Sequence, residues 1–208
     1  MPETMSFRDE IDYYHKEREL KELIVSDKTK VEFLEELVAV LFDKKDDETI
    51  KKTISKYKTE IKRLGVSIPL HETELEEMHK DFEKARSKGD KEKKEPLPDF
   101  VNAQAKYMTK KINEFQKAEK VSIASKTKLK VVQNEVKRLS KQTERSTGVE
   151  GYLSFLSDLC MKLEKQADED QTVMFDKDRE ALKEVDVLFG MMDRLKKGIP
   201  EPVEKEKE

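Results

Sequence analysis

One pair of side chains in this 208-residue chain has a spacing that binds metal in other helical proteins. Glu76 and His79 form a Glu-x-x-His motif, the pattern with which di-iron carboxylate bundles hold their metal. Such a centre needs a second copy of the motif, and neither His15 nor His71 provides one. In a chain so rich in glutamate, we interpret the motif as part of a solvated polar face. We expect no metal and no other cofactor.

Cys160 is the single cysteine and the first candidate for a catalytic nucleophile. Its neighbours Leu159, Met161 and Leu163 are typical of a small packing residue on a helix. No histidine follows His79, paired carboxylates recur without an apolar pocket, and the six glycines are too scattered for a phosphate-binding loop. We therefore predict that the protein is not an enzyme.

Basic residues gather in the segment 126–145, where they could bind an acidic polymer. Nucleic-acid phosphates and the acidic tails of tubulin are the candidate targets. Few aromatic residues accompany them, so stacking on unpaired bases is not indicated. The candidate residues are Lys126, Lys128, Lys130, Lys137, Arg138, Lys141 and Arg145. The interpretation that we favour is a basic flank neutralised by acidic residues of a neighbouring helix.

That neighbouring helix is predicted by two apolar stripes on either side of a short break at 146–151. The stripes cover 101–139 and 152–195, and both advance mainly by three and four residues, which is helical spacing. Between Lys106 and Arg145, twelve basic residues accompany four glutamates; from Glu150 to Glu208, sixteen acidic residues accompany ten basic ones. Opposite charge and the short turn favour a long antiparallel hairpin within one chain. Pairing with a second copy is the alternative.

Shorter helices are predicted before this hairpin. One begins after Ser6 and meets a polar interruption at 26–27, which is either a break or part of a longer helix. Asp46 or Asp47 caps the next helix, which is predicted to end at Gly65. Pro69 then indicates a short extended connector, followed by a further helix up to residue 86.

The predicted fold class is all-α: an elongated helical, coiled-coil protein with a long C-terminal antiparallel hairpin. Residues 1–86 form an N-terminal region of three or four helices, and 87–98 form a charged linker with Pro and Gly. Residues 99–197 form the hairpin and 198–208 a charged tail. The hairpin stripes are weakest at 118–125 and at 165–172.

Composition agrees with extended helices. Charged residues make up 43% and apolar ones 35%, too few of the latter for a compact domain, while their periodicity argues against disorder. No signal peptide and no membrane-spanning run is found, and membrane insertion is not expected. We expect a soluble intracellular protein, with the cytoplasm favoured over the nucleus.

Such helices present surface to other helices and offer no pocket. The sequence therefore predicts a non-catalytic coiled-coil scaffold subunit that binds other helical proteins, or itself, within a larger assembly. Cytoskeletal, trafficking and chromosome-associated assemblies all fit. The expected partner-binding seam consists of Val31, Leu34, Val38 and Leu41. The alternative function is direct binding of an acidic polymer through the basic segment 126–145.

Overall fold

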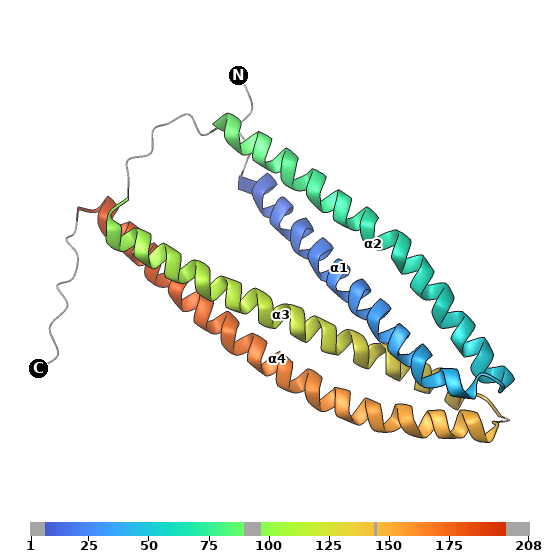
Figure 1. Ribbon diagram of the computed structural model, residues 1–208. Coiled ribbons are helices and arrows are strands. Elements are labelled where there is room, and N and C mark those ends of the chain that lie inside the picture. Colours follow the sequence, from blue (N-terminus) through green and yellow to red (C-terminus); the bar gives the residue numbers. More distant parts are fainter. Residues whose placement is uncertain (1–6, 90–96, 144, 199–208) are drawn as a thin grey trace, which may run out of the picture. The chain divides into compact units, whose positions relative to one another are not determined.

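A computed structural model describes residues 7–89, 97–143 and 145–198. Every regular element in these ranges is helical, so the all-α prediction is confirmed (Figure 1). The elements are α1 (Phe7–Leu41), the short 3-10 helix η1 (Phe42–Lys44), α2 (Glu48–Gly89), α3 (Asp99–Ser140) and α4 (Thr147–Lys196). The predicted Ser6 cap and much of the linker and tail lie outside the described residues.

The chain divides into two compact units, and both long C-terminal helices contribute to each of them. The first covers Met1–Glu92 and Lys120–Glu169, so it contains α1, η1, α2, the second part of α3 and the first part of α4. The second covers Lys93–Glu119 and Asp170–Glu208 and contains the other parts of α3 and α4. We call them the four-helix unit and the two-helix unit. The units divide α3 between residues 119 and 120 and α4 between residues 169 and 170. Both divisions lie within the stretches where the apolar stripes are weakest, 118–125 and 165–172.

Helix α1 passes through the polar residues 26–27 without a break, which decides between the two alternatives left by the sequence. Ser26 is half-buried and its hydroxyl lies 3.1 Å from that of Thr127 on α3. Thr29, one turn further along α1, is buried. These polar side chains therefore belong to the packed side of one longer helix.

Helix α2 also runs on where an end was predicted, so the helix end at Gly65 and the connector through Pro69 are wrong. Proline lacks the N–H that would bond the carbonyl of Gly65, four residues earlier. Both residues are exposed, so water can satisfy that carbonyl. Beyond the proline, Glu72 and Glu74 form ion pairs with Lys28 and Lys16 of α1, at 2.6 and 3.0 Å. Contacts with α1 thus keep the second half of α2 in place.

The turn of the hairpin lies at 141–146, because α3 ends at Ser140 and α4 begins at Thr147. The predicted turn at 146–151 is therefore wrong, since most of it belongs to the start of α4. The Ser146 hydroxyl accepts a hydrogen bond from the Val149 amide, which caps α4. Ser146 also donates to Asp47, the residue that caps α2 by accepting bonds from the amides of Thr49 and Ile50. Contacts in the four-helix unit therefore join the two inter-helix turns.

Cross-helix contacts show that α3 and α4 are antiparallel. In the two-helix unit, Gln104 donates to Glu184 at 2.8 Å, and Lys111 donates to Glu180 at 3.0 Å. In the four-helix unit, Gln133 donates to Glu164. Residue numbers thus rise along α3 while those of the partners fall along α4, as the hairpin prediction requires.

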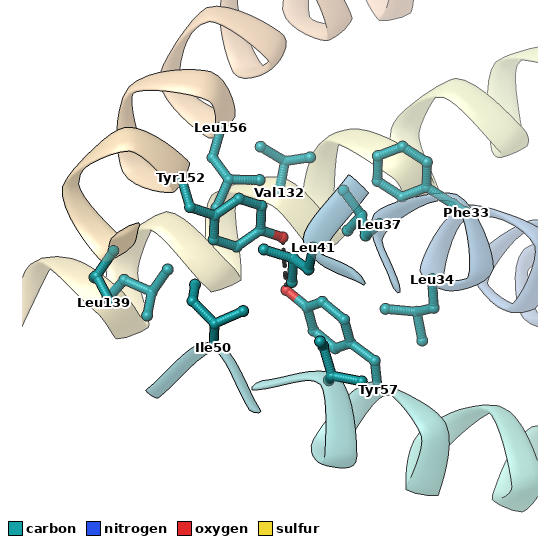
Figure 2. Close-up of a cluster of buried hydrophobic side chains, with 12 residues drawn as sticks. Phe33, Leu34, Leu37, Leu41, Ile50, Tyr57, Val132, Leu139, Tyr152 and Leu156 are labelled. Carbon is teal, nitrogen blue, oxygen red and sulfur yellow. Dashed lines mark hydrogen bonds between the residues drawn. The ribbon is translucent and has the colours of Figure 1, made fainter. Parts of the chain in front are cut away.

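The apolar core lies in the four-helix unit, where each of the four helices contributes fully buried side chains (Figure 2). Burial of such side chains is the main source of folding free energy. The labelled core residues are Phe33, Leu34, Leu37, Leu41, Ile50, Tyr57, Val132, Leu139, Tyr152 and Leu156.

Candidate interaction surfaces

The predicted partner-binding seam on α1 packs inside the chain itself. Leu34 and Leu41 are 3% and 0% exposed and belong to the core of the four-helix unit (Figure 2). Val38 packs against that core, and Val31 is half-buried. Leu34, Leu41 and Val38 thus pack in a core to which α2, α3 and α4 also contribute, so a partner helix would have to displace part of that core. Their role in binding another protein stays a prediction.

A polar cluster borders this core. The hydroxyls of Tyr57 and Tyr152 lie 3.2 Å apart, as the dashed line in Figure 2 shows. Burial raises the pKa of both phenols, that of Tyr152 to about 12. Glu135 is almost completely buried, and Arg138 binds it and donates to the Thr53 hydroxyl at 2.8 Å. Each of these groups has a partner within the four-helix unit, so none of them is left free to act on a ligand.

A groove of about 490 Å³ lies beside this cluster. Two ion pairs border it: Lys30 with Glu60 at 2.6 Å, and Lys56 with Glu135 at 3.7 Å. Hydrogen bonds from Arg63 and Lys30 lower the pKa of Glu60 to about 2. A ligand would have to break one of these pairs to bind a charged group, so the groove supports no catalytic or ligand-binding assignment.

The seven basic residues singled out from the sequence have two kinds of environment. Lys128 lies over the ring of Phe33 at 5.6 Å, Arg138 binds Glu135, and Arg145 donates to the backbone carbonyls of Ser140 and Gln142. The other four are exposed, and within the described residues none of them forms an ion pair. They are Lys126, Lys130, Lys137 and Lys141.

These four lysines lie on one side of α3 and its C-terminal end. They are separated by four, seven and four residues, which keeps them within about 60° of one another around the helix axis. In the described part of the chain, no acidic residue of α4 forms an ion pair with these four lysines, so the neutralisation expected from the sequence is not seen for them. Acidic and basic side chains of α3 and α4 do meet in the two-helix unit, where Lys111 contacts Glu180 and Lys177 contacts Glu114.

The candidate catalytic and metal-binding residues are not brought together. Glu76 faces Lys80 at 4.0 Å, and the His79 Nε2 atom lies 2.9 Å from a carboxylate oxygen of Glu17. No group of three or more metal-ligating side chains occurs in the described ranges. Burial and a hydrogen bond to Glu164 raise the pKa of the Cys160 thiol, which disfavours the reactive thiolate.

An exposed apolar line on α4 was missed in the sequence. Phe175, Leu182 and Phe189 are 51%, 57% and 67% exposed, and they follow one another at seven-residue intervals. Seven residues are close to two helical turns, so the three side chains share one side of the helix. Ala181, which is buried in the two-helix unit, lies about 100° away around the axis. We call Phe175, Leu182 and Phe189 the α4 stripe.

Spacing alone could have identified this stripe, because two aromatic residues and a leucine at heptad positions are typical of a helix–helix contact. The hairpin predicted from the sequence used a different apolar line of α4 for its seam, so the stripe was not considered.

None of the described helices combines the length and apolarity needed to cross a membrane.

Comparison of the chain with protein-family models, curated proteins and solved structures finds no match.

Proposed function

We propose that this protein is a non-catalytic scaffold subunit that binds other helical proteins within a larger assembly of the cytoskeletal, trafficking or chromosome-associated kind. The observation that supports this function is the α4 stripe, which exposes two phenylalanines and a leucine to water. Large apolar side chains gathered on one exposed face are typical of an interaction site. An amphipathic helix bound along such a line would remove them from water.

The stripe is better suited to this role than the α1 seam predicted from the sequence. Leu34 and Leu41 already contact the core, so a partner would have to replace existing packing. Phe175, Leu182 and Phe189 can be covered without moving any of that core. Binding there keeps the folding free energy of the chain intact and adds the free energy of new apolar burial.

Site-directed photo-crosslinking in cells tests this function. A crosslinking amino acid at Leu182 is expected to capture a helical protein, and the same amino acid at Val66, an equally exposed position on α2, serves as the control. The substitutions Phe175→Ser and Phe189→Ser should abolish capture at position 182 while helicity is retained. Equal capture at both positions, or capture that survives these substitutions, would contradict the proposal.

A second function, binding of an acidic polymer such as nucleic acid or tubulin tails, is supported by the four exposed lysines on α3. Their side chains lie on one face and have no acidic partner in the described residues. Each contact with a phosphate releases a counterion, so binding through this face should weaken steeply with salt.

Charge reversal separates this second function from the first. Replacing Lys126, Lys130, Lys137 and Lys141 by Glu should abolish salt-sensitive binding to polyanions with helicity intact. A matched variant with the same change in net charge carries Glu at Lys51, Lys58, Lys62 and Lys110, which are also exposed. Equal loss in the two variants would mean that net charge alone attracts the polymer.

A further inference from the structure

We propose that the α4 stripe binds the α4 stripe of a second copy of this chain, in an antiparallel pair with two-fold symmetry. This inference rests on the proposed function, because it names the helical partner that covers the stripe. The two-helix unit contains only parts of α3 and α4, so the α4 stripe faces no further helix of that unit.

The stripe has the symmetry that a two-fold interface requires. Such an interface uses the same surface on both copies, so each residue contacts its counterpart on the opposite side of the axis. Leu182 lies midway between Phe175 and Phe189, seven residues from each. With the axis at Leu182, the two leucines meet, and Phe175 of each copy packs against Phe189 of the other.

The charges beside the stripe fit the same arrangement. Arg179 and Asp186 border it on one flank, three residues before and four residues after Leu182. In an antiparallel pair, equal flanks of the two helices meet, so Arg179 of each copy faces Asp186 of the other. Within one chain, Arg179 contacts only the exposed Asp176, at 3.6 Å, and Asp186 forms no ion pair in the described residues. Two charge pairs therefore become available on association.

A parallel pair would use these groups less well. It would bring Arg179 of one copy near Asp178 of the other and leave Asp186 beside Val185, an apolar neighbour. It would also align the two helix dipoles in the same direction, which is the less favourable orientation. In a parallel pair the acidic partner of Arg179 is the half-buried Asp178, whereas in an antiparallel pair it is the exposed Asp186, so charge favours the antiparallel arrangement.

The expected association is weak. Two phenylalanines and one leucine that are about half exposed can bury on the order of 300 Å² per copy. A stable interface buries roughly 800 Å² per partner. We therefore expect a dimer that dissociates on dilution, with apolar contact supplying attraction and the charge pairs setting the orientation.

Complementary charge reversals test the proposal on the full chain. Sedimentation velocity from micromolar to millimolar concentration should show reversible dimerisation of the wild type. Arg179→Asp places two acidic residues opposite each other, and Asp186→Arg places two basic ones, so each variant should dimerise at least about tenfold more weakly. An equimolar mixture of the two variants restores opposite charges at both contacts and should form a heterodimer. The double variant R179D/D186R should dimerise like the wild type.

The control is Lys110→Glu, which reverses an exposed charge on α3, the other helix of the two-helix unit, and should leave dimerisation unchanged. A wild-type chain that stays monomeric at all concentrations overturns the inference, as does a mixture that associates no better than the separate variants. Crosslinking at Leu182 distinguishes failure of the dimer from failure of the proposed function. If the chain is monomeric and position 182 captures a different helical protein, the proposed function stands and the dimer is overturned. If position 182 captures nothing, both the proposed function and the dimer are overturned.

Discussion

The four-helix unit and the two-helix unit bury helical stripes of the same kind to different depths. Val132, Leu139 and Leu156 of α3 and α4 are completely buried in the four-helix unit. In the two-helix unit, Val101 and Ala181 are the only buried apolar side chains among the described residues, and Ile112 and Leu188 on the same two helices are half-buried. A helix with several neighbours loses contact with water on most sides, whereas a helix with one neighbour loses it on one.

Because of this difference, the residues that stabilise the fold and the residues that could bind a partner lie in different parts of the same helix. The first part of α4 contributes to the core, and its second part carries the exposed α4 stripe. Free energy of folding is therefore concentrated in the four-helix unit, while the exposed α4 stripe, which could bind a partner, lies in the two-helix unit. Substitutions placed in the two regions of the same helix can test this directly.

The largest expected difference is between Leu156→Ala and Leu188→Ala on α4. Leu156 is fully enclosed, so its truncation leaves a cavity and should lower the free energy of unfolding by about 3 to 4 kcal/mol. Leu188 is half-buried, and its truncation should cost about 1 kcal/mol because water fills the space. Denaturant titration followed by circular dichroism, with hydrogen exchange to assign the loss to a unit, measures both. Similar losses at the two positions would contradict the comparison.

A smaller effect is expected from the tyrosine pair at alkaline pH. Burial raises the pKa of Tyr152 to about 12 and that of Tyr57 as well, so both remain protonated in the folded chain at a pH where the unfolded chain has lost these protons. The folded chain then binds more protons, and stability must fall as pH rises from about 10 to about 12. Below pH 10 this contribution is fully present.

Thermal unfolding between pH 9 and pH 11 measures this loss, which should be about 1 kcal/mol for each tyrosine over that interval. The variants Tyr57→Phe and Tyr152→Phe should each unfold with a shallower dependence on alkaline pH than the wild type. Tyr107→Phe, which removes an exposed phenol on α3, is the control. An alkaline slope that is the same in all four proteins would show that the buried pair does not contribute.

Local patterns in the sequence predicted an all-helical chain, the hairpin and the cap of α2 by Asp47, because apolar periodicity and capping act within a few residues. The predicted three or four helices before the hairpin are wrong, since the described part of that region consists of the two long helices α1 and α2 and the short η1. Local patterns failed at Gly65 and Pro69, where packing between α1 and α2, including the buried Phe82 stacked on Tyr13, outweighs the local preference for a break. They also failed to predict that Leu34 and Leu41 pack against α3 and α4, since nothing in a stripe indicates which helix will cover it. The hydrogen bond between Tyr57 and Tyr152 joins residues 95 positions apart and has no local signal.

The α4 stripe is a second case in which apolar periodicity does not tell which side of a helix is packed. Its heptad spacing was visible in the sequence, but Met174, Ala181 and Leu188 form a second apolar line on the same helix. Only the structure decides which of the two lines is packed and which is exposed. Helical periodicity thus predicts how many apolar faces a helix has, and the number of its neighbours decides how many remain for a partner.

The smallest expected effect concerns the charges between α3 and α4 in the two-helix unit. Lys111 lies 3.0 Å from Glu180 and 3.4 Å from Glu114, and Lys177 contacts the same two carboxylates. Because this cluster is partly open to water, Lys111→Met should lower the unfolding midpoint less than Leu188→Ala does. The decrease should shrink further in high salt, which screens partly exposed pairs.

Lys165→Met, which removes one exposed pair with Glu169 within α4, controls for the loss of a single positive charge. Hydrogen exchange should place the effect of Lys111→Met in residues 99–119 and 170–196 and leave the core around Leu156 unchanged. A salt-independent loss, or one larger than that of Leu188→Ala, would mean that these ion pairs and not apolar burial hold the two-helix unit together. In that case the stability of the two-helix unit would depend on charge, whereas that of the four-helix unit depends on its apolar core.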